Sequence, residues 1–259
     1  MTKILVTGSS DGIGKEAARR LAQAGAQVIV HGRTEARAAE AAKGIAGAEI
    51  WVCDFSSLEE VRTAAARLPR GLDVVINNAG VYLQRREVTR DGYEATFQTN
   101  HLAPFLLTNL LLPSMNEGSR IVNVSSQVHT GAEIAWDDLM GERRFSGYGA
   151  YAQSKLANLL FTRALASRQK KATVNALHPG VIGTKLLHAG FGGMGGGSLA
   201  DGAATPVYLA LSPDVEGVTG KYFVSSRETR PARQALDDAD AERLWGLSEG
   251  LTGFAAAER

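Results

Sequence analysis

Tyr151 and Lys155 stand four residues apart in the segment Tyr-Ala-Gln-Ser-Lys. On a helix this spacing places the phenol and the ammonium on one face, one turn apart. A free tyrosine has a pKa near ~10, and lowering it to ~7 requires roughly 4 kcal/mol. A cation about 4 Å away at an effective dielectric of about 20 supplies that much. The pair therefore suits proton transfer, although a purely structural Tyr–Lys pair has the same spacing.

A glycine-rich segment, G-x-x-x-G-x-G, separates a short apolar run at 4–6 from a helix-period stretch at 13–24. Glycines let phosphates approach the main chain closely, and the N-terminus of a helix offers free N–H groups to anions. Between a strand and a helix, such a segment predicts a dinucleotide phosphate site more than a structural turn. The expected contacts are Gly8, Ser10, Asp11, Gly12, Ile13 and Gly14.

The residues after the second apolar run bear on cofactor choice. An NAD site usually has an acid about 20 residues beyond the glycines, to bond the ribose 2′-hydroxyl. Gly32 stands there, and Arg33 and Arg37 follow. A guanidinium can pair with a 2′-phosphate, although Arg33 could also be a solvated surface charge. Asp11 in the phosphate loop argues mildly the other way, so we predict that NADP(H) is preferred and NAD(H) is the alternative.

Short apolar runs alternate with longer helix-period segments along the chain. The runs are continuous, which indicates strands buried on both faces, and the alternation predicts a parallel, doubly wound sheet. We expect an α/β fold of Rossmann type with a mostly seven-stranded parallel sheet in three α/β/α layers, as a single domain over 1–259. The expected strands are 4–6, 28–30, 50–52, 74–76, 120–124, 174–177 and 221–224. The expected helices are 13–24, 35–43, one capped by Ser56 or Ser57, 93–112 and 151–167.

Two segments carry no regular pattern, 127–149 and the glycine-rich 190–197. A glycine run inside a compact domain is either disordered or a mobile loop over a site, and we favour the loop. The substrate pocket would be built from 127–148 and 191–199.

Composition excludes several classes of protein. Apolar residues make up 44% and charged residues 21%, with a net charge of +1, so we expect neither a nucleic-acid partner nor an anionic membrane partner. The apolar run at the N-terminus is too short for a signal peptide, and no segment has the roughly 20 apolar residues of a membrane span. A lone cysteine, Cys53, fits a buried position and a cytoplasmic location.

Other catalytic patterns are missing from the sequence. No cluster has the spacing of metal ligands, so we expect no metal. Ser125 and Ser126 lack the G-x-S-x-G context of a serine hydrolase. His129 and His178 are interpreted as structural side chains.

From Thr7 to about Thr184 the sequence resembles the short-chain dehydrogenase/reductase family. The motifs that carry the resemblance are the glycine motif, Asn77-Asn78-Ala79-Gly80, Asn100, Val124-Ser125-Ser126, Tyr151-x-x-x-Lys155 and Pro179-Gly180. Segments 89–94, 100–102 and 154–162 are most similar to the retinol dehydrogenase and WW-domain oxidoreductase branch.

The resemblance implies catalytic roles for four side chains. Tyr151 would be the general acid for carbonyl reduction or the base for alcohol oxidation, and Lys155 would lower its pKa and hold the nicotinamide ribose. Ser126 would hydrogen-bond the substrate oxygen, with Ser125 as the alternative. Asn100 would position a water in a proton relay, unless it is simply a buried, hydrogen-bonded side chain.

Further cofactor contacts follow from the ends of the expected strands. Asp54 and Phe55 follow the third strand, where Asp54 can receive the adenine amino group or cap the next helix. The resemblance implies that the adenosine and ribose follow Asn78, Ala79 and Gly80, and that the segment after Pro179 and Gly180 contacts the carboxamide through Ile182 and Thr184.

We therefore expect an NADP(H)-dependent oxidoreductase that reduces an apolar aldehyde or ketone, or oxidises the matching alcohol. The alternatives are an NADP-sensing protein without catalysis and an epimerase or dehydratase that uses the same cofactor. Family members often pair through the helices that carry Asn100 and Tyr151, which implies a homodimer or homotetramer.

Overall fold

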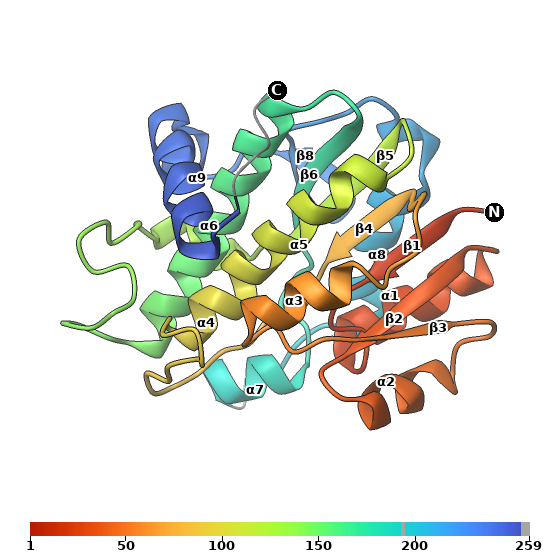
Figure 1. Ribbon diagram of the computed structural model, residues 1–259, viewed down its shortest axis with the longest axis horizontal. Helices are drawn as coiled ribbons and strands as arrows, with labels where there is room; N and C mark the ends of the chain where they lie inside the picture. The colour runs from red at the N-terminus through yellow and green to blue at the C-terminus, as the bar shows by residue number, and fades with distance from the viewer. Residues whose placement is uncertain (193–194, 255–259) are drawn as a thin grey trace.

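An eight-stranded sheet forms the centre of the protein in the computed structural model, which describes residues 1–192 and 195–254 (Figure 1). The strand order is β3-β2-β1-β4-β5-β6-β7-β8, parallel throughout except for the antiparallel β7–β8 pair. The strands are β1 (Lys3–Val6), β2 (Gln27–Gly32), β3 (Glu49–Val52), β4 (Val74–Asn77), β5 (Ser119–Val124), β6 (Ala172–His178), β7 (Tyr222–Val224) and β8 (Arg227–Thr229).

The Rossmann-type, doubly wound sheet that the sequence predicts is confirmed, and each of the seven expected runs forms a strand. The eighth strand, β8, is an addition to that expectation. It consists of three exposed residues with no apolar run, and a tight turn joins it to β7. Ser225 and Ser226 form this turn at φ 49° and 59°, where glycine or asparagine is the usual choice. Neither the strand nor its turn therefore carries the usual sequence signal.

Alternate residues of the central strands enter two separate apolar cores, as expected for a sheet covered on both faces. In β1, Ile4 and Val6 pack into one core and Leu5 into the other. The first core is covered by α1 (Gly12–Gln23), α2 (Glu35–Ala42) and α8 (Leu199–Leu211). The second is covered by α3 (Leu58–Ala65), α5 (Ala103–Leu111) and α6 (Gly147–Arg168), which lie along the front of the sheet in Figure 1. No helix among the described residues is long and apolar enough to cross a membrane.

The helix expected over 93–112 is divided into several parts. It comprises α4 (Ala95–Phe97), a π-helical turn η1 (Gln98–Leu102), α5, and a 3-10 turn η2 (Leu112–Ser114). Helix α6 starts at Gly147 instead of Tyr151, because the Ser146 hydroxyl accepts a hydrogen bond from Gly149 N–H at 3.0 Å and caps it. Periodicity does not distinguish a π-turn from an α-helix, and it missed the short polar beginning of α6.

The segment expected to be irregular around the glycine run is partly helical. Helix α7 (Lys185–Phe191) includes Gly190, and Gly197 pairs with Ile182 in an isolated bridge. Gly193 and Met194, at the centre of the expected mobile loop, lie outside the described residues. The other expected irregular segment contains the 3-10 turn η3 (Gln127–Gly131).

A C-terminal helix that the sequence reading did not identify, α9 (Asp238–Thr252), packs against α6 and α5 (Figure 1). Its Trp245 ring lies 4.9 Å from the Phe105 ring of α5 and 6.1 Å from the Phe161 ring of α6. The first pair is edge-to-face and the second is stacked, and both arrangements are typical of aromatic side chains packed in a core. Helix α9 thus covers a face of the two helices through which the family resemblance implied pairing.

Because α9 covers that face, we expect the protein to be a monomer of 27.4 kDa rather than a dimer or tetramer. Size-exclusion chromatography with light scattering measures the mass directly, and a stable wild-type dimer would contradict this expectation.

The packing of α9 also predicts an effect on stability. The Trp245→Ala variant should lose about 3 kcal/mol of stability, whereas Leu247→Ala, at a position 38% exposed on the same helix, should lose little.

Candidate active site

A cavity of about 630 Å³ runs along the carboxyl ends of the strands, from β2 across to β6. This edge is where open α/β sheets bind ligands. The cavity brings together nearly all of the residues that the sequence singled out. Those that line it are Gly8, Ser10, Asp11, Gly12, Ile13, Gly14, Arg33, Arg37, Phe55, Asn78, Ala79, Gly80, Ser126, Tyr151, Lys155, Pro179, Gly180, Ile182 and Thr184. Two expected residues, Asp54 and Asn100, do not contribute to this lining.

The glycine-rich turn has no room for side chains. Gly8 adopts φ +64°, and a Cβ atom there would lie 2.7 Å from Ala79 Cα. A Cβ at Gly14 would overlap the side-chain amide of Asn78, which donates to Thr7 O at 2.8 Å. The bare main chain and the N-terminus of α1 therefore border the cavity directly, and this cradle fits the diphosphate of a dinucleotide.

The side chain of His31 supports the glycine-rich turn through a hydrogen bond, and this residue was not identified from the sequence. Its Nδ1 accepts a hydrogen bond from Gly8 N–H at 2.8 Å, and its Nε2 lies 2.8 Å from Cys53 O. The ring stacks on Phe55 at 4.8 Å. Burial lowers the pKa of His31 to about 4, so the neutral ring accepts at Nδ1 and donates at Nε2. The only sequence signal was a histidine placed among apolar residues of a strand.

Gly32, Arg33 and Arg37 lie together where β2 ends and α2 begins. A Cβ at Gly32 would lie 2.7 Å from Ala38 N, so no carboxylate fits there without moving α2. Arg33 and Arg37 are exposed and both line the cavity. This end of the cavity therefore presents two guanidinium groups and no acid at the position of Gly32.

Asp54 does not cap α3, and it lies outside the lining of the main cavity. Its carboxylate accepts from Ser56 N–H at 3.0 Å, and its own N–H donates to Glu60 Oε1 at 2.8 Å. Ser57, not Asp54 or Ser56, caps α3 by accepting from Glu60 N–H. Asp54 lines a smaller adjoining pocket of about 390 Å³, which shares Arg33 with the main cavity.

Tyr151 and Ser126 meet at the other end of the cavity. Tyr151 comes from the first turns of α6 and is 6% exposed, and its hydroxyl is hydrogen-bonded to the Ser126 hydroxyl. Burial raises the pKa of Tyr151 above its usual range, and the Ser126 bond only partly opposes this. The expectation that Lys155 lowers this pKa is not met in the structure, because the loss of water around the phenol outweighs other effects.

Lys155 is almost fully buried, and its Nζ donates to Val124 O at 3.0 Å. The Nζ atom lies 5.4 Å from the centre of the Tyr151 ring. Burial lowers the pKa of Lys155 to about 8. Ser125, the alternative to Ser126, donates its hydroxyl to Lys155 O at 2.7 Å and is buried. Ser125 therefore supports the helix that carries Lys155. Both serines line the cavity, and Ser126 is the one whose hydroxyl is hydrogen-bonded to Tyr151.

Asn100 lies in the π-helical turn and is fully buried. Its Nδ2 donates to Val81 O at 3.0 Å and to Ser154 Oγ at 2.9 Å, while Oδ1 accepts from Val81 N–H at 2.8 Å. These bonds occupy both amide protons, so the side chain joins the Gly80 loop to α6. A relay water would have to bind a main-chain group or the second lone pair of Oδ1.

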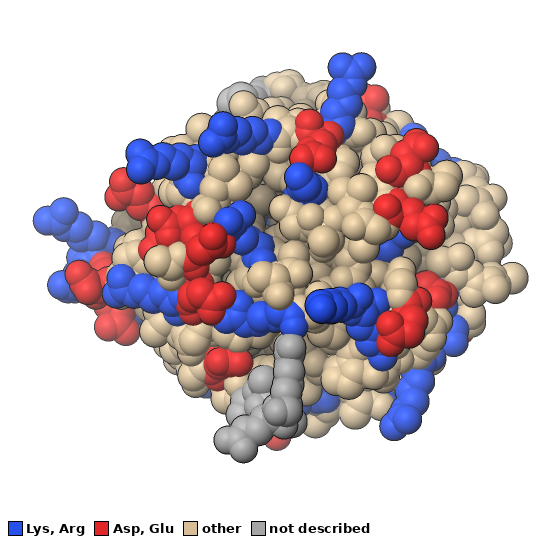
Figure 2. Space-filling model, turned by 90° about the horizontal axis from the view of Figure 1, so that it is seen from above, with Lys and Arg blue, Asp and Glu red and all other residues tan. Residues whose placement is uncertain are grey.

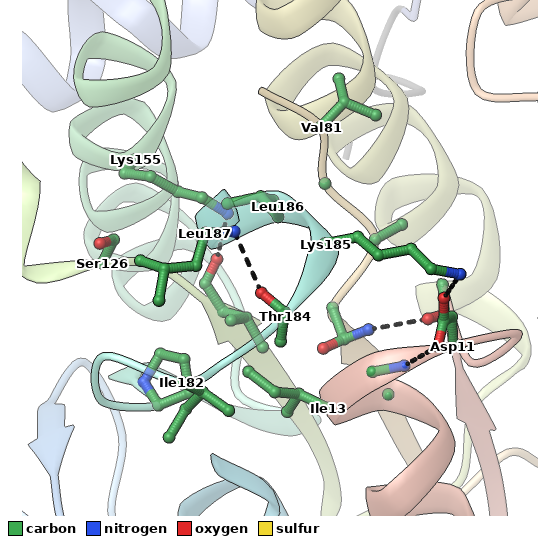
Figure 3. Close-up of a pocket in the computed structure, with 18 of the residues that line it drawn as sticks. Asp11, Ile13, Val81, Ser126, Lys155, Ile182, Thr184, Lys185, Leu186 and Leu187 are labelled. Atoms are coloured by element: carbon green, nitrogen blue, oxygen red, sulfur yellow. Dashed lines mark hydrogen bonds and ion pairs between the residues drawn. The ribbon is translucent and has the colours of Figure 1, made fainter. Parts of the chain in front are cut away.

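Helix α7 covers the cavity and adds apolar lining that the sequence reading missed. Leu186 and Leu187 line the cavity together with Val81 (Figure 3). Val128 and Tyr148 also line it, in agreement with the pocket expected from 127–148, whereas the described residues 195–199 do not. The signal was present, since Thr184 precedes an apolar pair and caps α7 by accepting from Leu187 N–H at 3.2 Å.

Two histidines lie near Ser126. The Nδ1 of His129 is 2.7 Å from Ser126 O, and its Nε2 accepts from Ala232 N–H, which agrees with a structural role. His178 lines the cavity, and its buried Nδ1 has no hydrogen-bond partner among the described residues. Burial lowers its pKa to about 4. It is therefore not the satisfied structural histidine that was expected.

The surface charge is mixed. Figure 2 shows basic and acidic side chains interspersed over one face, without a broad region of one sign. Within the described part of the chain, no three His, Cys, Asp or Glu residues are grouped to hold a metal ion.

Comparisons with known proteins agree with this geometry. The family model "short chain dehydrogenase" matches residues 2–191, and the chain belongs to that family. Retinol dehydrogenase 14 of Mus musculus is 40% identical over 287 residues, covering 97% of this chain and 86% of the mouse protein. The protein is thus an oxidoreductase that acts on a CH–OH/C=O pair with a nicotinamide cofactor.

Solved structures show the same fold. A crystal structure from Mycobacterium paratuberculosis superposes with a TM-score of 0.85 at 34% identity, covering 98% of this chain and 94% of the other. A short chain dehydrogenase from Burkholderia cenocepacia J2315, in complex with NADP, gives a TM-score of 0.70 at 28% identity, with 86% and 95% covered.

The buried histidines make stability dependent on pH. Burial lowers the pKa of His31 to about 4 and that of His101, in the core beneath α9, to about 3. As the pH falls, these histidines are therefore protonated in the unfolded chain before they are protonated in the folded protein. The free energy of unfolding has its full value above about pH 6.5 and falls from there toward pH 4. Each histidine contributes up to about 1.4 kcal/mol per pH unit over this range.

Urea unfolding at several pH values measures this slope. The His31→Asn variant should have a slope smaller by about one proton, whereas His188→Asn, on the exposed side of α7, should keep the wild-type slope. A free energy of unfolding that stays constant between pH 6.5 and 4.5 would refute the linkage.

Proposed function

We propose that the protein is an NADP(H)-preferring reductase of an apolar aldehyde or ketone. One observation carries the proposal: a single cavity has two guanidinium groups at its β2 end and the Tyr151, Ser126 and Lys155 set at its β5–α6 end. Such a cavity can hold a dinucleotide 2′-phosphate at one end and a carbonyl group at the other.

The acid is Tyr151. Its raised pKa keeps the phenol protonated at neutral pH, so it can donate its proton to the oxygen of a reduced carbonyl. Ser126, already bonded to the same hydroxyl, supplies a second donor for that oxygen and holds the phenol in position. Carbonyl reduction uses the phenol in this protonated form, whereas oxidation of the matching alcohol uses the phenolate as base.

Lys155 supplies the positive charge of the site. With a pKa of about 8, its ammonium is mostly charged at neutral pH. One proton is bound to Val124 O, which leaves two donors for ligand hydroxyl groups, such as those of a ribose. The positive charge of Lys155 also stabilises the phenolate that remains on Tyr151 after its proton has been transferred.

The bound nicotinamide dinucleotide would supply the hydride. The glycine cradle would hold its diphosphate, and Asn78, Ala79 and Gly80 would follow the ribose. Ile182 and Thr184 would face the carboxamide. Asp54 and Phe55 would border the adenine, with Arg33 and Arg37 at the 2′-phosphate. Asn100 would act as a positioning residue through its hydrogen bonds to Val81 and Ser154.

The side chains that line the cavity favour an apolar substrate. Leu186, Leu187, Val128 and Val81 form an apolar wall, and burial of such surface contributes about 25 cal/mol per Å². The mouse relative is named for retinol, an apolar alcohol, which supports the same class of substrate.

The Tyr151→Phe variant should lose roughly a hundredfold or more in kcat/KM, because it lacks the transferable proton. NADPH oxidation with a panel of apolar aldehydes and ketones measures this loss, and cofactor binding should persist. The Tyr208→Phe variant, on α8 away from the cavity, serves as the control. Undiminished turnover in Tyr151→Phe would overturn the assignment, and a wild type that binds NADPH without turning over any substrate would favour a sensing protein.

The Arg33→Ala variant should weaken NADPH binding by about tenfold or more while leaving NADH binding nearly unchanged, since only NADPH carries the 2′-phosphate. Titration calorimetry with both cofactors tests this, with Arg70→Ala as the matched control on an exposed loop before β4. If wild-type protein binds NADH more tightly than NADPH, the cofactor proposal fails.

A further inference from the structure

An ion pair joins the two sides of the cavity mouth. Lys185, the first residue of α7, binds the carboxylate of Asp11, which precedes α1, although the two are 174 residues apart in the chain. Figure 3 shows the Lys185 side chain extending to Asp11, with Thr184 and Ile13 both below it in the view. Both charged residues line the cavity.

The local geometry puts this pair directly over the phosphate cradle. Asp11 Oδ1 accepts from Gly12 N–H at 2.8 Å, and Oδ2 binds Lys185 Nζ. A Cβ at Gly12 would lie 3.6 Å from Thr184 Cγ2, so the segment before α7 sits against the start of α1. The Lys185 ammonium is thus held beside the main-chain turn that fits a diphosphate.

The charges that line the cavity indicate which group the Lys185 ammonium can bind. Hydrogen bonding to Lys185 is the largest effect that lowers the pKa of Asp11, so the carboxylate is ionised and would repel a phosphate. Arg33 and Arg37 lie at the β2 end, and Lys155 lies at the α6 end bound to Val124 O. Among the described lining residues, Lys185 is the cation placed at the glycine turn.

The Lys185–Asp11 ion pair contributes little to the stability of the fold. The side chains of Lys185 and Asp11 are 91% and 58% exposed, and exposed ion pairs contribute little to folding. An ammonium bound so weakly can exchange its carboxylate partner for a phosphate oxygen at small cost.

We propose that Lys185 binds the diphosphate group shared by NAD(H) and NADP(H), and that Asp11 holds the ammonium at the cavity mouth until the dinucleotide arrives. This inference rests on the proposed function only in requiring a nicotinamide dinucleotide in the cavity. It assigns to Lys185 a contact common to both cofactors, whereas Arg33 contacts the group that distinguishes them.

Titration calorimetry with four ligands tests the assignment on the full-length protein. The Lys185→Gln variant should bind ADP-ribose, NADH and NADPH roughly fivefold more weakly than wild type. Adenosine, which has no phosphate group, should bind with less than about a twofold change. The control is Lys221→Gln, because Lys221 is likewise an exposed lysine paired with an acid, Glu228, but lies outside the cavity.

The Asp11→Asn variant distinguishes a Lys185 that binds the diphosphate from a Lys185 that only pairs with Asp11. Asparagine still caps a helix, so α1 should persist. Removing the carboxylate frees Lys185 and removes a repulsive charge, so the three diphosphate ligands should bind as tightly as to wild type or more tightly. Equal weakening by Asp11→Asn and Lys185→Gln would overturn the proposal, as would unchanged binding in Lys185→Gln. If wild type bound none of the dinucleotides, the proposed function itself would fail.

Discussion

The hydrogen bond from Lys155 Nζ to Val124 O is the interaction on which the site depends. A buried ammonium costs several kcal/mol of hydration, and one carbonyl group restores only part of that. The lowered pKa of Lys155 records this cost. The cost is tolerated because Val124 ends β5 at the carboxyl edge of the sheet, which is where the cavity lies. The ammonium therefore keeps donors available to a ligand.

The rest of the fold serves to hold this edge open and aligned. Asn100 ties the Gly80 loop to α6, and Ser125 ties β5 to the same helix through Lys155 O. His31 fixes the glycine turn from the opposite end. These buried bonds join four strands and one helix around the cavity, so the charged and acidic groups are positioned before any ligand binds.

The architecture followed from the sequence because doubly buried strands have a strong apolar signature. Strand β8 could not be predicted in this way, because its residues are polar and exposed. Helix α9 was missed because its buried face, centred on Trp245, alternates with charged residues and packs on helices rather than on the sheet. The π-turn at Asn100 leaves no trace in periodicity, because it shifts the helix by one residue only.

The candidate site was predictable where main-chain geometry dictates residue type, as at Gly8 and Gly14. Effects that depend on burial were not. The sequence suggested that Lys155 makes Tyr151 more acidic, but the spacing of two residues says nothing about the water that each one loses. The same holds for His31, whose partner Gly8 lies in a different βα turn of the chain.

A crystal structure with NADP and an unreactive carbonyl compound tests the central claim most directly. The account predicts a carbonyl oxygen within about 3 Å of both the Tyr151 and Ser126 hydroxyl groups, with ribose hydroxyls on Lys155 Nζ. A ligand whose polar group lies away from Tyr151, or a dinucleotide bound outside the glycine turn, would contradict it.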